Sequence, residues 1–189
     1  MKKVLVTIAI IVGVIAVSVM WSIGVRNGLI DADESAAKTW KDIGVQLERR
    51  ADLVPNLVNT VKGYATHEKE IFTAVAEARA KLIAAKSPAE KAAADGSLNS
   101  ALGRLLAISE NYPALKADSA FLRLQDELAG TENRIAVTRT RYNDAVKSFN
   151  VSIRKFPGSL FASGLGFAPK EYYEVAEGKA VATPPTVQF

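Results

Sequence analysis

The chain has 189 residues, of which 24 are lysine or arginine and 20 are aspartate or glutamate, so its formal net charge is +4. Lys2, Lys3 and Arg26 flank an apolar N-terminal stretch and supply three of these four charges. Because the remainder is close to neutral, we do not expect a nucleic acid as a partner. The chain contains no cysteine, which excludes disulfides, thiolate metal sites and thiol nucleophiles.

The first predicted element is a transmembrane helix over residues 4–25, a run without any charged residue. A helix of this length reaches about 30 Å, the thickness of the hydrocarbon core of a bilayer. Trp21 lies near its exit end, where tryptophan suits the membrane interface. The alternative is a cleaved leader, for which the run is long and residues 16–18 form a poor cleavage site.

The charges on either side of this run predict its orientation. Two lysines precede it, whereas Asp31, Asp33 and Glu34 follow it. The positive-inside rule therefore places the N-terminus in the cytoplasm and the rest of the chain beyond the membrane. The expected parts are a cytoplasmic N-terminus with the anchor (residues 1–26), an extracytoplasmic helical bundle (27–175) and a flexible tail (176–189).

Beyond the anchor, apolar residues recur at alternating spacings of three and four, which predicts long helices packed side by side as in a coiled coil. The expected fold class is all-α: an N-terminal transmembrane helix followed by an antiparallel bundle of three to four long helices. The three stripes comprise Ala36, Trp40, Ile43, Leu47, Arg50 and Val54; Leu57, Val61, Tyr64, Glu68, Ile71, Val75, Ala78 and Leu82; and Phe121, Gln125, Leu128, Glu132, Ile135, Arg139, Tyr142, Val146, Phe149, Ile153 and Phe156.

Pro55 is expected to begin a new helix, because proline breaks the interior of a continuous one. A hairpin is therefore predicted near residues 53–55. Antiparallel packing around that turn would place Trp40 level with Glu68, within reach of a hydrogen bond from the indole N–H to the carboxylate.

The next helix starts at residues 87–90, which form a capping box with proline at the first helical position. The Asp-Gly pair at residues 95–96 is expected to interrupt it and to leave a short helix over residues 97–111. Asp118 or Ser119 then caps the long final helix.

Four charged residues, Arg50, Glu68, Glu132 and Arg139, fall on the apolar stripes, where a charge is tolerated only when it is paired. One interpretation is a functional polar track through the bundle. The other is a set of ion pairs that fix helix register, or side chains at the stripe edge that reach solvent.

Two blocks of sequence resemble the LemA family over nearly the whole chain. The first covers residues 37–79 and the second begins at residue 142. The matching positions are Trp40, Gln46, Leu47, Arg49, Arg50, Asp52, Leu53, Pro55, Asn56, Leu57, Val58, Val61, Lys62, Gly63, Tyr64, His67 and Glu68, then Tyr142, Asn143, Phe149, Asn150, Phe156, Pro157, Gly166 and Phe167.

The resemblance implies a protein of the bacterial cytoplasmic (inner) membrane that has one span, an extracytoplasmic bundle and no established activity. It points to envelope organisation rather than to chemistry, and to no cofactor. The motif residues with an expected structural role are Trp40, Arg50, Asp52, Pro55, Asn56, Tyr64 and Glu68.

No catalytic or metal-binding residue is predicted. His67 is the only histidine, and the His-Glu pair at residues 67–68 would point to different faces of a helix, unlike the spacing that zinc proteases use. No nucleophile elbow, phosphate-binding loop or pair of carboxylates is present, so an enzyme is the least favoured class.

The segment over residues 156–167 contains no charge and is expected to return to the membrane end of the bundle. Its large apolar residues would then enter the membrane interface or contact a neighbouring subunit; the alternative is a cap on the open end of the bundle. These residues are Phe156, Leu160, Phe161, Leu165 and Phe167.

Two functions remain open. The first is a self-associating scaffold anchored in the lipid bilayer, in which many tethered copies strengthen weak lateral contacts. The second is an adaptor or regulatory subunit of a membrane protease or sensor, which would bind through a helix face or through the C-terminal residues Val187 and Phe189.

Overall fold

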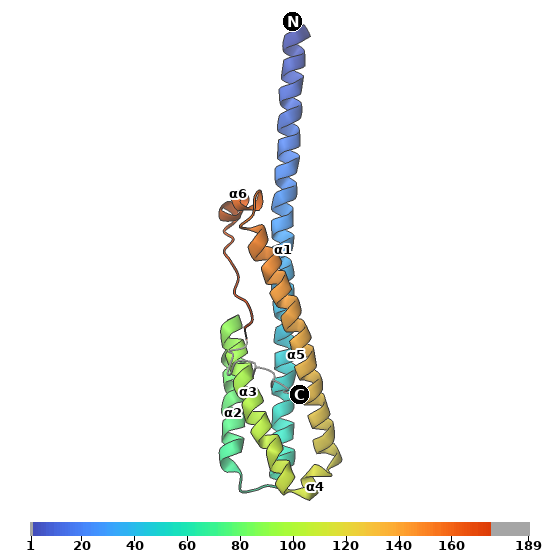
Figure 1. Cartoon of the computed structure of the whole chain (residues 1–189), viewed down its shortest axis with the longest axis vertical. Helices are drawn as coiled ribbons and strands as arrows, with labels where there is room; N and C mark the ends of the chain where they lie inside the picture. The colour runs from blue at the N-terminus through green and yellow to red at the C-terminus, as the bar shows by residue number, and fades with distance from the viewer. Residues whose placement is uncertain (1, 175–189) are drawn as a thin grey trace, which may run out of the picture. The chain divides into compact units, whose positions relative to one another are not determined.

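The computed structural model describes residues 2–174, which form helices joined by short turns, without a strand in that range (Figure 1). The all-α prediction is therefore confirmed. The elements are α1 (Lys2–Lys62), α2 (Lys69–Ala84), α3 (Pro88–Ile108), α4 (Pro113–Lys116), α5 (Ser119–Ser152) and α6 (Gly158–Ala162), with 3₁₀ turns η1 (Ser109–Asn111) and η2 (Ser163–Leu165).

These elements divide into two compact units. Unit 1 comprises residues 2–41 and 140–170, and unit 2 comprises residues 42–139 and 171–174. Helices α1 and α5 each contribute one part to unit 1 and another to unit 2.

Unit 1 begins with the apolar part of α1, which is long and apolar enough to cross a membrane and has no buried residue along that stretch. Further along α1, Leu29 packs against Phe149 of α5, against Ile153 in the turn that follows α5, and against Ala162 of α6. The start of α6 approaches α5 closely, because a Cβ atom at Gly158 would overlap the carbonyl oxygen of Ser152 and lie 3.2 Å from the Leu29 side chain. Only glycine fits there without a shift of the backbone.

Unit 2 is a helical bundle in which α2 and α3 lie side by side (Figure 1). Its buried residues follow the spacing of threes and fours along each helix, as the sequence predicts. They include Ile43, Leu47, Val54, Leu57 and Val61 of α1, Phe72, Val75, Ala78 and Leu82 of α2, Leu98, Leu102 and Leu105 of α3, and Phe121, Leu128 and Ile135 of α5.

The predicted hairpin near residues 53–55 is wrong, because α1 continues through Pro55 to Lys62. A proline inside a helix cannot donate a hydrogen bond to the carbonyl four residues earlier, here that of Ala51. In this bundle the Ala51 carbonyl accepts a hydrogen bond of 2.7 Å from Nε of Arg79 on α2. A side chain from the neighbouring helix thus replaces the missing donor and allows α1 to continue.

The turn lies instead at residues 63–68, so the predicted second stripe is interrupted there. Glu68 is the N-cap residue of α2, and His67 lies in the turn rather than on a helix. The predicted pairing of Trp40 with Glu68 depended on the misplaced hairpin and is not found. The Trp40 ring packs instead against Tyr142 of α5, with 5.3 Å between the ring centroids.

The capping box of α3 is confirmed: the Ser87 side chain accepts a hydrogen bond from the Glu90 backbone, and the Glu90 carboxylate accepts one from Ser87. The predicted interruption at residues 95–96 is wrong, since α3 runs unbroken to Ile108. Asp95 is buried inside that helix, and its carboxylate is tolerated there because it forms an ion pair with Arg50. Asp118 caps α5 as predicted, by accepting hydrogen bonds from two backbone N–H groups.

Candidate functional sites

An aromatic cluster lies beside the last turns of the apolar run, within unit 1. The Trp21 ring lies 6.3 Å from the ring of Phe156 and 6.5 Å from that of Phe161, measured between centroids. These separations are typical of interacting aromatic rings. The structure therefore brings the segment over residues 156–167 to the exit end of the apolar helix.

The apolar residues of that segment divide into two sets. Phe161, Leu165 and Phe167 pack against the core of unit 1, and Phe167 meets Phe149 edge to face at 5.4 Å. Phe156 and Leu160 point outward and are 73% and 64% exposed. The segment thus covers the end of unit 1 with one set of side chains and presents the other set to its surroundings.

The end of the segment is fixed to α5 and α1. The Asn150 side chain donates a hydrogen bond to the Lys170 carbonyl (2.9 Å) and accepts one from the Lys170 backbone N–H (2.8 Å). The Lys170 ammonium forms an ion pair of 2.8 Å with Asp33 and lies over the Phe149 ring. We call the two hydrogen bonds between Asn150 and Lys170 the clamp. Because Gly166 adopts a left-handed conformation (φ +70°), the chain can turn back from α6 toward this clamp.

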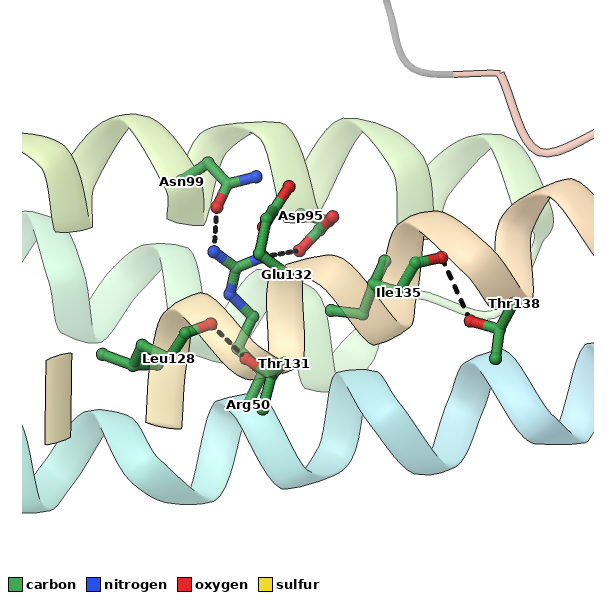
Figure 2. A network of polar contacts seen from close by, with 8 residues as sticks. All are labelled: Arg50, Asp95, Asn99, Leu128, Thr131, Glu132, Ile135 and Thr138. Carbon is green, nitrogen blue, oxygen red and sulfur yellow. Dashed lines mark hydrogen bonds and ion pairs between the residues drawn. The ribbon is translucent and has the colours of Figure 1, made fainter. Parts of the chain in front are cut away.

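A second site is a buried polar cluster in unit 2 (Figure 2). Arg50 of α1 is 4% exposed, and its Nη1 atom donates hydrogen bonds to Asp95 (3.1 Å) and to Glu132. Its Nη2 atom donates to the side-chain carbonyl of Asn99. Asp95 and Asn99 come from α3 and Glu132 from α5, so one guanidinium group joins three helices.

The electrostatics of this cluster reflect its burial. Burial raises the pKa of Asp95, the nearby Glu132 carboxylate adds to that effect, and the Arg50 charge opposes it. Tyr173, which is also buried, has a pKa raised well above its usual range, first by burial and then by the Asp95 carboxylate. The cluster thus pairs the buried Arg50 with one buried carboxylate, Asp95, and with the half-exposed carboxylate of Glu132.

The structure joins only part of the predicted polar track. Arg50 and Glu132 meet, and Arg139 lies near enough to lower the pKa of Asp95, whereas Glu68 lies at the start of α2. Sequence reasoning missed Asp95 because it interpreted that position as a helix break. A signal was present, since position 95 continues the spacing of the buried α3 residues Leu98, Leu102 and Leu105.

The other motif residues have local roles. The exposed Tyr64 hydroxyl donates a hydrogen bond of 2.9 Å to Asp118, the residue that caps α5. Asp52 lies 4.0 Å from Arg79, and Asn56 is exposed on α1. Within residues 2–174, no group of three histidine, aspartate or glutamate side chains is arranged to hold a metal ion. Val187 and Phe189 lie outside the described residues.

Fold and sites together define a class of protein: a helix able to cross a membrane that continues without a break into an α-helical bundle. The chain belongs to the LemA family, whose model matches residues 39–189. The resemblance found in the sequence is thereby confirmed.

Three relatives extend this result. The chain is 27% identical over 174 residues to magnetosome protein MamQ 2 of Paramagnetospirillum magneticum, and 28% identical over 173 residues to magnetosome protein MamQ of Magnetospirillum gryphiswaldense. Each alignment covers 78% of this chain and 64% of the relative, so the chain spans less than two thirds of those proteins. It is 25% identical over 159 residues to protein LemA of Metamycoplasma hominis, covering 82% of this chain and 71% of that protein. Family and apolar helix together indicate a membrane-associated protein.

Proposed function

We propose that this protein is a non-enzymatic, single-pass membrane protein that self-associates and organises the bacterial cell envelope. Residues 1–26 form the cytoplasmic N-terminus and anchor in the cytoplasmic membrane, and residues 27–175 form the extracytoplasmic bundle.

The observation that carries this proposal is the continuity of α1. The helix passes from its apolar part into the folded part of unit 1 without a linker, and Leu29 already lies in the core of that unit. A folded unit attached in this way is held close to the membrane with restricted orientation, which raises the effective concentration of lateral contacts between copies. A flexible linker would reduce that gain.

The relatives support a role in organising the cell envelope rather than in catalysis. Two of them carry the name magnetosome protein, and none of the three names denotes an enzyme. The buried polar cluster fits this view. Arg50 uses both of its terminal nitrogens on partners within unit 2, as expected of an ion pair that fixes helix register.

The test is the mass of the detergent-extracted full-length protein, compared with a version that starts at Asn27 and therefore keeps Leu29. We expect a discrete assembly for the full-length protein and a smaller particle without the anchor. Circular dichroism checks that both are equally helical. A control version carries an unrelated apolar span of equal length and should assemble like the natural chain if tethering, rather than a specific span contact, is what matters.

A monomer in both forms would contradict the scaffold and favour the adaptor. In that case the full-length protein should capture a membrane protease or sensor, and a version without residues 187–189 should lose it. Capture that survives this deletion would direct the search to a helix face.

A further inference from the structure

Phe156 and Leu160 are large apolar side chains that the fold holds in an exposed position. The segment that carries them is ordered by the packing of Phe161, Leu165 and Phe167 beneath it and by the clamp between Asn150 and Lys170. An exposed apolar pair on a fixed platform is typical of a contact surface rather than of a mobile loop.

The position of this surface indicates what it meets. Trp21 belongs to the apolar run that ends at Val25, and its ring contacts Phe156 and Phe161. The segment that carries the outward-facing pair therefore lies beside the last turns of the apolar run, and a span over that run would bring the segment to the depth where headgroups meet acyl chains. Aromatic residues favour that zone.

The charges around the pair fit a lipid surface. Residues 145–170 contain no acidic residue and four basic ones, Lys147, Arg154, Lys155 and Lys170. Lys170 is paired with Asp33, whereas Arg154 and Lys155 are exposed directly before Phe156. Cations next to apolar anchors are the pattern of interfacial segments that bind anionic lipids.

We propose that residues 154–165 form a second membrane contact, in which Phe156 and Leu160 enter the headgroup region and Arg154 and Lys155 bind the phosphates of an anionic lipid such as phosphatidylglycerol. This contact fixes unit 1 on the bilayer. It rests on the membrane anchoring in the proposed function and is independent of self-association.

The absence of cysteine allows a direct test on the full-length protein. L160C is labelled with an environment-sensitive fluorophore and reconstituted in vesicles of phosphatidylglycerol and phosphatidylcholine. The matched control is V137C, which labels another exposed apolar position, on the part of α5 in unit 2. We expect the label at position 160 to emit at shorter wavelength and to be quenched by lipids that carry a nitroxide near the headgroup, and the label at position 137 to show neither effect.

Two outcomes would overturn the proposal. Equal behaviour at positions 160 and 137 would mean that the segment stays in water. A blue shift at position 160 that resists nitroxide lipids and disappears when the protein is diluted with lipid would mean that a second copy covers the surface. A monomer that still shows quenching would leave this proposal intact while the scaffold failed.

The charge and the apolar anchor are tested separately in the same labelled protein. F156D should lower the quenching at position 160, because a carboxylate opposes entry into the interface; unchanged quenching would mean that the label alone partitions, against the proposal. K155E, or vesicles of phosphatidylcholine alone, should also lower it. Quenching that is independent of both would refute the binding of lipid phosphates.

Discussion

The guanidinium of Arg50 holds two carboxylates and one amide that come from two other helices. Asp95, at 5% exposure, depends on this partner, whereas the Glu132 side chain is 48% exposed and remains solvated without it. Removal of the arginine thus leaves one buried carboxylate without its ion-pair partner.

We predict that R50M lowers the free energy of unfolding by about 3–5 kcal/mol, the usual cost of removing one partner of a buried ion pair. The loss should be greatest at neutral pH. It should shrink as the pH falls, because burial raises the pKa of Asp95 and protonation removes the stranded charge. Denaturant titration of the full-length protein in detergent, at several pH values, measures the free energy of unfolding.

The double variant R50M/D95L is the control for this interpretation, since it removes both charges and fills the space with apolar groups. It should regain most of the lost stability. R49M, at the exposed neighbouring position, should change little. A double variant as unstable as R50M would contradict the ion-pair account and point to packing around the arginine.

The Asp118 side chain caps α5 by accepting hydrogen bonds from two backbone N–H groups, and it also accepts one from the Tyr64 hydroxyl. Hydrogen bonds from the backbone N–H of Phe121, then from Tyr64, lower its pKa. A carboxyl group with a lowered folded-state pKa contributes stability above its unfolded pKa, about 3.9, and loses that contribution as the pH falls through the folded value.

The thermal midpoint of D118A should therefore lie below that of the natural protein at pH 7, and the two midpoints should converge in acid. D118N should keep part of the cap, because an amide oxygen still accepts from the backbone. Circular dichroism melts over a pH series provide the measurement. A difference that stayed constant with pH would show that the carboxylate charge is not involved.

At the scale of the element, α1 shows how a helix tolerates an internal proline. Pro55 has no backbone N–H to donate to the carbonyl of Ala51, which is a buried residue. That carbonyl accepts a hydrogen bond from the Arg79 side chain of α2 instead. The accommodation of Pro55 thus depends on a side chain that lies 28 positions beyond Ala51 in the sequence.

We predict that R79A lowers the free energy of unfolding by about 1–3 kcal/mol, the cost of leaving a buried acceptor unsatisfied. The same substitution should cost clearly less in a P55A background, because alanine restores the backbone donor to the Ala51 carbonyl. A double-mutant cycle from denaturant titrations gives the coupling energy. Additive effects would mean that Arg79 acts through Asp52 or packing instead.

At the scale of the whole molecule, α1 carries the apolar run that is able to cross a membrane, part of the unit 1 core and one helix of the unit 2 bundle. Deletion of the span should therefore change the concentration of the folded part at the membrane more than its fold. For this reason the assembly experiment compares particles of equal helicity, and a smaller assembly would report lost tethering.

Much of the fold follows from local patterns. The uncharged run over residues 4–25, the spacing of buried residues, the capping box at Ser87 and the Asp118 cap each depend on residues close in sequence. The helix breaks predicted at Pro55 and Asp95 are wrong. Both residues disfavour a helix interior locally, and contacts with residues distant in sequence overcome that preference.

The sequence by itself determined the fold class, the apolar N-terminal helix and the family, and it predicted that residues 156–167 return to the exit end of that helix. Only the tertiary structure decided where α1 ends, which acids pair with Arg50, and that Phe156 and Leu160 face outward while Phe161 packs inward. The physical reason is that sequence spacing reports the local preferences of the backbone. Satisfaction of a buried carbonyl or charge, by contrast, depends on groups 28 and 45 residues away that meet only when the helices pack.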